Sequence, residues 1–201
     1  MTDWQAQGPE SGPDGRARCP WGAGSDEYRA YHDAEWGRPL RGDDALFERL
    51  TLEAFQSGLS WLTILRKRPA FRAAFAGFSI PVVAAFGADE RARLLADAGI
   101  VRNRAKVDAA IANAQAALRL LDAEGEGALD RLLWSYAPEP LPPPRVMGDL
   151  PAKTPESAAL AKALKRSGFV FVGPTTMYAL QQAVGMVDDH LAGCWRRGQA
   201  G

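Results

Sequence analysis

The amino-acid sequence predicts an all-α fold, on three observations. Apolar residues recur three and four positions apart along most of the chain, which is the spacing of amphipathic helices. Residues that begin and end helices flank these stretches, with polar N-caps and prolines before them and glycines after them. Strict alternation of apolar and polar residues is nearly absent, and the extended run FVFVG at 169–173 is too short to found a sheet.

The first pair of helices is expected within residues 43–75. An apolar stripe begins with Leu46, Phe47 and Leu50, and the helical spacing is interrupted at Gly58 before a second stripe follows. Further helices are expected over 79–87, 88–100 and 103–125, with glycine where each would stop: Gly87, Gly99 and Gly125.

The second half of the chain predicts a loop and two more helices. Residues 136–155 are too rich in proline for a helix or a central strand, so we expect a surface loop. Thr154 as N-cap and the proline after it then open a helix that closes at Gly168. A last helix over 175–194 completes the fold.

Length and composition indicate one soluble globular domain. The chain has 201 residues, 47% of them hydrophobic, and equal numbers of basic and acidic residues, 24 of each. Residues 18–197 are expected to form the domain, with a disordered leader over 1–17 and a tail over 198–201. No stretch is apolar enough for a membrane span or a signal peptide, so we expect a cytoplasmic monomer that contacts no membrane.

The cysteines and histidines, whose sulfur and nitrogen atoms could bind a metal ion, lie in two groups near the ends of this domain. There are two cysteines and two histidines in all: Cys19, His32, His190 and Cys194. If 175–194 form one helix, His190 and Cys194 share a face, because positions i and i+4 do. Four such ligands fill one tetrahedral zinc shell and leave no position for an activated water. We therefore expect one structural zinc per chain, joining the N-terminal and C-terminal segments.

Two alternatives to a metal site stay open at this stage. Each cysteine could be an ordinary buried apolar residue, and each histidine a satisfied or exposed one. A nucleophilic pair of His190 and Cys194 is a weaker alternative, because it needs an oxyanion hole and leaves Cys19 and His32 unexplained.

Residues 94–114 predict a helix, a short turn at Gly99 and a second helix. Arg102, Arg104 and Lys106 surround the start of the second helix. Free backbone N–H groups and the positive end of a helix bind a phosphate well, which is how a helix-hairpin-helix grips a DNA backbone. A glycine between helices is also an ordinary C-cap, so the motif alone does not decide the matter.

Aromatic residues cluster in the segment 19–37 and at Trp61, near a carboxylate in an apolar helix, Glu53. Most aromatic residues belong to a core, but tryptophan and tyrosine beside one carboxylate also form pockets that stack on a flat heterocycle. A surface ion pair between Arg49 and Glu53 is the plainer interpretation of that carboxylate.

Taken in order, these motifs resemble the type I DNA-3-methyladenine glycosylase family. The resemblance rests on YHDAEWG, LTLEAFQSGLSWLTIL, DAGIVRNRAKVDAAIANA, WSY and ALAKALKRSGFVFVGPTTMYALQQAVGMVDDHLAGC, and it runs from about Arg18 to Cys194. It implies the all-α fold of the helix-hairpin-helix DNA glycosylases. It also implies a zinc ion bound by Cys19, His32, His190 and Cys194.

The resemblance further implies roles for individual residues in the recognition of an alkylated base in double-stranded DNA. Glu53, Tyr31 and Trp61 would line the base pocket, with Trp21 and Trp36 close by. Gly58 and Leu59 would probe the gap that a flipped base leaves in the duplex. The family does not depend on a catalytic aspartate after the hairpin.

The expected activity is therefore the hydrolytic removal of 3-methyladenine from alkylated DNA, which leaves an abasic site. A base inside a duplex is unreachable, so it must first be flipped out. The main alternative is a zinc-stapled protein that binds damaged DNA without cutting it, and such a protein has no need of Glu53. A cysteine-dependent hydrolase is a third possibility, in which Cys194 would be essential to activity.

Overall fold

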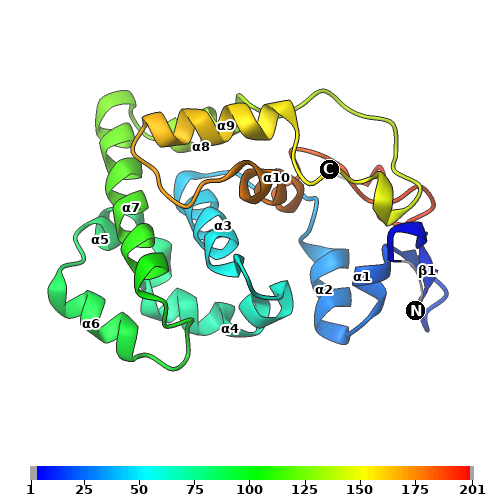
Figure 1. Ribbon diagram of the computed structural model, residues 1–201, viewed down its shortest axis with the longest axis horizontal. Coiled ribbons are helices and arrows are strands. Elements are labelled where there is room, and N and C mark those ends of the chain that lie inside the picture. Colours follow the sequence, from blue (N-terminus) through cyan, green and yellow to red (C-terminus); the bar gives the residue numbers. More distant parts are fainter. Residues whose placement is uncertain (1–3, 200–201) are drawn as a thin grey trace.

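The computed structural model describes residues 4–199, and these residues form a mostly helical protein (Figure 1). The prediction of a mostly helical fold is therefore confirmed. The α-helices are α1 Pro20–Ala23, α2 Asp26–Ala34, α3 Asp43–Gln56, α4 Trp61–Ala74, α5 Ile80–Ala84, α6 Ala88–Ala96, α7 Arg104–Glu124, α8 Ala128–Trp134, α9 Pro155–Arg166 and α10 Pro174–Ala183. There are also three short 3-10 helices: η1 Trp4–Ala6 before α1, η2 Ala76–Phe78 between α4 and α5, and η3 Met147–Asp149 between α8 and α9.

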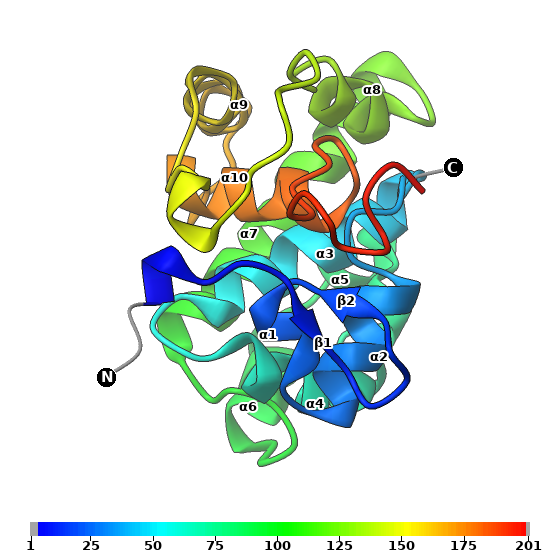
Figure 2. The same ribbon diagram turned by 90° about the vertical axis from the view of Figure 1, so that its right-hand side faces the viewer.

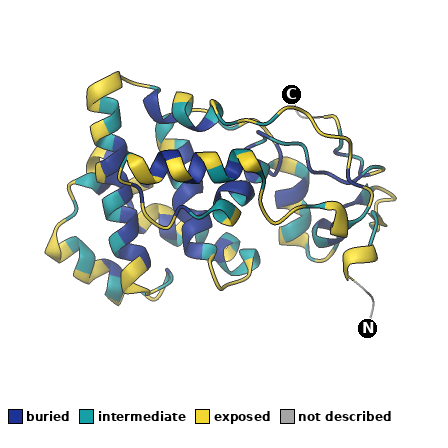
Figure 3. Ribbon diagram, turned by 45° about the horizontal axis from the view of Figure 1, so that its top comes forward, coloured by how far each residue is buried: buried dark blue, intermediate teal, exposed yellow. Residues whose placement is uncertain are grey.

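Helix α3 forms the centre of the core. It packs against α4, α7, α8 and α10, and its residues from Leu50 to Phe55 are all buried. Figure 3 shows the surrounding helices with one buried face and one exposed face, as their amphipathic sequences require. A polar residue in the middle of α3 is therefore taken out of water whichever way it points.

Most predicted helix boundaries agree with the structure. Thr154 caps α9 by accepting a hydrogen bond from the backbone N–H of Ser157 at 3.1 Å. The helices α3 and α4 meet at a turn in which Gly58 has a φ of +78°, a conformation that glycine adopts without strain. The sequence did not predict α1, α2 or α8, and the run at 169–173 forms no strand in the structure.

Residues 4–17 differ from the prediction of a disordered leader, while residues 1–3 lie outside the described part. Strand β1 Glu10–Ser11 pairs with β2 Ala17–Arg18 in an antiparallel hairpin. Arg18, which is buried, holds Asp14 and Asp33 through short charge-assisted hydrogen bonds. This polar anchoring does not depend on apolar residues, so the composition of the segment could not reveal it. The domain division itself stays a prediction.

The last helix is shorter than predicted. Helix α10 ends at Ala183, and the chain turns at Gly185, whose φ is +75°. A Cβ at that glycine would lie 2.5 Å from the backbone of Arg38, so the turn and the close approach both require glycine. His190 and Cys194 consequently lie in an irregular segment, and the prediction that they share a helix face is wrong.

The two ends of the described chain lie on the same side of the molecule, at the right of Figure 1 and in front in Figure 2. The backbone N–H of Trp195 donates a hydrogen bond to the carbonyl of Ala17 at 2.9 Å. Among the described residues, no helix is long and apolar enough to cross a membrane.

Candidate functional site: an aromatic pocket and a metal-ligand cluster

A cavity of about 280 Å³ opens between the N-terminal helices and the core. Its lining comes from five parts of the chain, namely α1, α2 with the turn that follows it, α3 with the start of α4, the loop around η3, and α10. The lining residues are Trp21, Tyr28, Tyr31, Trp36, Glu53, Gln56, Trp61, Met147, Leu150, Ala179 and Gln182. All five residues predicted to form a base pocket are among them.

The aromatic side chains form a box with rings at several angles. Trp21 lies edge-on to Trp36 with centroids 4.9 Å apart, and Tyr31 lies 5.4 Å from Trp61. Rings at these distances suit offset or edge-on contacts and present flat apolar faces to a guest. The cavity is therefore shaped for a planar heterocycle.

Glu53 brings a carboxyl group to this apolar box. Its side chain is only 5% exposed, and burial raises its pKa to about 7 while the positive charge of Arg49 acts in the opposite direction. The plainer interpretation of a surface ion pair with Arg49 is wrong, because both residues are buried in α3. Within residues 4–199, Arg49 instead pairs with Glu35 and donates to Tyr31.

The turn between α3 and α4 carries Gly58 and Leu59, the two residues predicted to probe the duplex. Leu59 is 40% exposed, an unusual position for a large apolar side chain, and its backbone N–H donates to the carbonyl of Gln56 at 2.7 Å. Gln56 also lines the cavity, so the turn begins next to a residue of the cavity wall.

The turn between α6 and α7 supports only part of the predicted phosphate grip. Arg102 and Arg104 are exposed, and Asn103 caps α7. Lys106, however, is buried and donates to the carbonyls of Phe55 and Ser57 at 2.8 and 2.5 Å. Its ammonium therefore satisfies carbonyl groups at the C-terminal end of α3, and its role in DNA binding stays a prediction.

Gly99 has a structural reason of its own at this turn. Its backbone N–H already donates a hydrogen bond to the carboxylate of Asp97 at 2.7 Å. A Cβ at Gly99 would lie 3.0 Å from the Cβ of Ala70, so the glycine lets the turn approach α4. Of the four residues predicted to bind DNA here, two are thus engaged within the protein.

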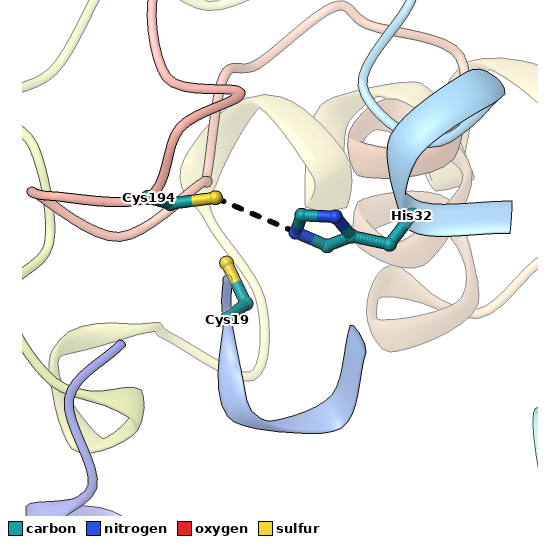
Figure 4. Close-up of side chains that lie close together, drawn as sticks. All are labelled: Cys19, His32 and Cys194. Carbon is teal, nitrogen blue, oxygen red and sulfur yellow. Dashed lines mark hydrogen bonds between the residues drawn. The ribbon is translucent and has the colours of Figure 1, made fainter. Parts of the chain in front are cut away.

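Cys19, His32 and Cys194 come together as a cluster that could hold a metal ion. Their ligand atoms lie within 4.8 Å of one another, and all three side chains are buried. Figure 4 shows the two sulfur atoms and the His32 ring facing a common point from distant parts of the chain. Nε2 of His32 lies 3.5 Å from the sulfur of Cys194.

His190 lies beside this cluster without belonging to it in the structure. Its ring centroid is 5.0 Å from that of His32, and its Nε2 is buried with no hydrogen-bond partner in the described chain. A buried polar atom without a partner costs free energy, so it marks a position where a ligand is expected.

Carboxylates orient both histidines. Nδ1 of His32 lies 2.8 Å from Asp33, and Nδ1 of His190 lies 2.8 Å from Asp188. Such contacts direct the other ring nitrogen to a metal and make it more basic. The backbone N–H of Leu191 donates to the sulfur of Cys19 at 3.4 Å, and the hydrogen bond with Cys19 lowers the pKa of the Cys194 thiol. The donor set therefore fits a soft divalent cation.

Several residues of the site were not found from the sequence. Asp33 and Asp188 gave a usable signal, since each lies within two positions of a histidine. Met147 and Leu150 gave none, because nothing local in a proline-rich loop says that it folds over a cavity.

Comparisons with known proteins agree with this geometry. A family model described as methyladenine glycosylase matches residues 21–197. DNA-3-methyladenine glycosylase 1 of Escherichia coli strain K12 is 43% identical over 182 residues, covering 88% of this chain and 95% of that relative. A crystal structure of a 3-methyladenine DNA glycosylase I matches with a TM-score of 0.84 at 42% identity, covering 90% of this chain and 99% of that one. A variant of such an enzyme in complex with 3-methyladenine matches with a TM-score of 0.84 at 35% identity, covering 92% and 99%.

The mostly helical fold matches that of solved DNA glycosylases. Because the family model spans most of the chain and the identity to relatives is high, the chain belongs to the methyladenine glycosylase family.

Proposed function

We propose that this protein is a base-excision repair DNA glycosylase that removes 3-methyladenine from alkylated double-stranded DNA. The observation that carries the proposal is the buried carboxylate of Glu53 in the wall of an aromatic cavity. The names of its relatives support the same substrate.

The proposed basis of recognition is charge. Methylation at N3 makes adenine cationic and weakens its bond to the sugar, so the base is already a good leaving group. At about 4 Å and an effective dielectric near 20, a carboxylate attracts such a cation by on the order of 4 kcal/mol. Glu53 would thus favour the alkylated base over neutral adenine, while Tyr31 and Trp61 stack on its faces at about 1–3 kcal/mol per contact.

The remaining residues would serve base flipping. Leu59 at the tip of its turn would fill the gap in the duplex, with Gly58 supplying the backbone conformation. Arg102 and Arg104, with the N-terminus of α7, would bind a phosphate in the manner of a helix-hairpin-helix.

Excision is proposed to be monofunctional hydrolysis, in which water replaces the base and leaves an abasic site. A lyase-type enzyme would need a lysine as nucleophile, and among the described residues that line the cavity there is none. The proposal also places the protein in the cytoplasm as a monomer, as its sequence predicts.

The proposed metal is one structural zinc ion, with His190 as the fourth ligand beside Cys19, His32 and Cys194. Zinc bound by four protein side chains has no open position, so its contribution would be to folding. The ring of His190 lies 4.7 Å from Trp36, which couples the proposed metal site to the pocket wall.

The test is to incubate the protein with alkylated DNA and to identify the released bases by chromatography. We expect free 3-methyladenine and an abasic strand, and a loss of about 100-fold or more in the rate for Glu53→Gln, because the charge attraction is removed. Binding of damaged DNA without any released base would support the alternative, and trapping of a protein–DNA adduct by borohydride would contradict monofunctional hydrolysis.

A further inference from the structure

Arg49 is a buried cation that the proposed chemistry leaves unexplained. It lies one helical turn before Glu53 on α3 and is 7% exposed. Its Nη1 donates a hydrogen bond to the hydroxyl of Tyr31 at 2.9 Å. Its closest carboxylate partner in the described chain is Glu35, at 3.6 Å, and Glu35 is held more tightly by Arg68 through two hydrogen bonds.

The guanidinium also contacts both aromatic walls of the pocket. Its central carbon lies 5.4 Å from the ring centroid of Tyr31 and 5.4 Å from that of Trp61. These distances are within the range of cation–π attraction. One side chain therefore touches the two rings proposed to stack on the base.

The charge of Arg49 acts on Glu53 without closing a salt bridge to it. Positions four apart on a helix share a face, so the two side chains are neighbours. Arg49 donates to Tyr31 and pairs with Glu35, and within residues 4–199 the oxygens of Glu53 accept no hydrogen bond, so they are free for a guest. The nearby positive charge of Arg49 opposes the effect of burial on the pKa of Glu53. The other charged groups near this site are Glu35 on the chain just after α2 and Arg68 on α4, which pair with each other, and α10 contributes only the neutral Ala179 and Gln182.

We propose that Arg49 is a positioning residue of the base pocket, whose guanidinium holds Tyr31 and Trp61 in place and keeps the Glu53 carboxylate charged and free for a cationic base. This inference rests on the proposed function. A methionine or leucine could fill the same volume without the desolvation cost of a buried cation, so a purely structural role does not account for an arginine here.

The experiment measures the single-turnover rate of 3-methyladenine release against pH, with enzyme in excess. In the unmodified protein the rate should fall on the acid side as Glu53 takes up a proton. Arg49→Met and Arg49→Gln remove the charge, so the pKa of Glu53 should rise and the acid limb should move to higher pH by about 1 unit. Arg49→Lys keeps the charge and should leave the limb in place.

Three controls separate charge from packing. Tyr31→Phe removes the hydroxyl contact but not the charge, so it should slow release without moving the acid limb. Arg66→Met removes an exposed arginine on α4 that pairs with Glu27 on α2. This variant should not move the acid limb either. In a Glu53→Gln background, Arg49→Met should have no further effect on the pH profile. Circular dichroism checks that each variant is folded. If Arg49→Met does not fold, Arg49→Gln is used in its place.

The outcomes distinguish this inference from the proposed function. A limb that stays in place in both neutral variants, or that moves equally in Arg49→Lys, overturns the role of Arg49 alone. If the unmodified protein releases no 3-methyladenine at any pH, the proposed function fails instead.

Discussion

The buried carboxyl of Glu53, which is proposed to recognise the base, also lowers the free energy of unfolding when it is charged. Its pKa is raised from 4.5 to about 7 by burial, so the folded state holds the proton more tightly than the unfolded chain does. The stability that this group contributes is complete below pH 4.5 and is lost as pH rises through about 7. At about pH 8 the buried charge should therefore cost the protein up to about 3 kcal/mol.

Glu53→Gln should accordingly stabilise the fold while it impairs excision. We expect the free energy of unfolding to rise by up to about 3 kcal/mol at about pH 8 and to change little at about pH 3.5, where the carboxyl is mostly protonated in both states. Urea denaturation at the two pH values measures this. An equal change at both pH values would mean that packing, and not charge, is responsible.

At the scale of elements, the turn between α6 and α7 carries two exposed cations, Arg102 and Arg104, and one buried cation, Lys106. Arg102→Ala and Arg104→Ala should each reduce the slope of log affinity against log salt for DNA by about 1, because each would release about one counterion fewer. Lys106→Ala should destabilise the protein by about 1–3 kcal/mol instead, since it leaves the carbonyls of Phe55 and Ser57 without their donor. Filter binding over a salt series and thermal unfolding distinguish the two effects, and a reduced slope with unchanged stability in Lys106→Ala would contradict the assignment.

The sequence predicted those elements that local signals determine. The ends of α9 and the turn at Gly58 follow from capping residues and from glycine, whose effects act over a few positions. Helix α10 was predicted too long, because the apolar spacing continues past Gly185, while the close approach to Arg38 that fixes the turn is a tertiary contact.

The same distinction applies to the site. The pocket residues could be chosen by residue type, since aromatic rings and one isolated carboxylate already suggest a chemistry. The direction of a long polar side chain could not, which is why Lys106 was predicted to face DNA and Arg49 was considered as a surface partner of Glu53. Both side chains reach groups that are 18 to 51 positions away in sequence.

Over the whole molecule, the pocket depends on joining the two ends of the chain. Trp21 and Trp36 come from the N-terminal segment and contact the histidines of the ligand cluster, Trp21 at 5.1 Å from His32 and Trp36 at 4.7 Å from His190. Between α10 and residue 199, where the described chain ends, the segment that carries Cys194 forms no helix or strand. Metal ligation would therefore replace regular secondary structure as the means of fixing this part of the fold.

Metal removal should thus act on stability first and on excision only through it. We expect about one zinc per chain by elemental analysis, and a loss of about 2 kcal/mol or more in the free energy of unfolding after chelation or in Cys194→Ala. Asp188→Asn is the matched milder variant: it keeps all four ligands but loosens the orientation of His190, so metal affinity should fall by about 10–100-fold while the loaded protein remains folded. Single-turnover excision per folded molecule should change little in that variant, because the cluster offers no group to the base. A chain that binds no metal, or that unfolds at the same temperature with and without chelator, would show that the buried cysteines and histidines hold the two ends together by packing alone.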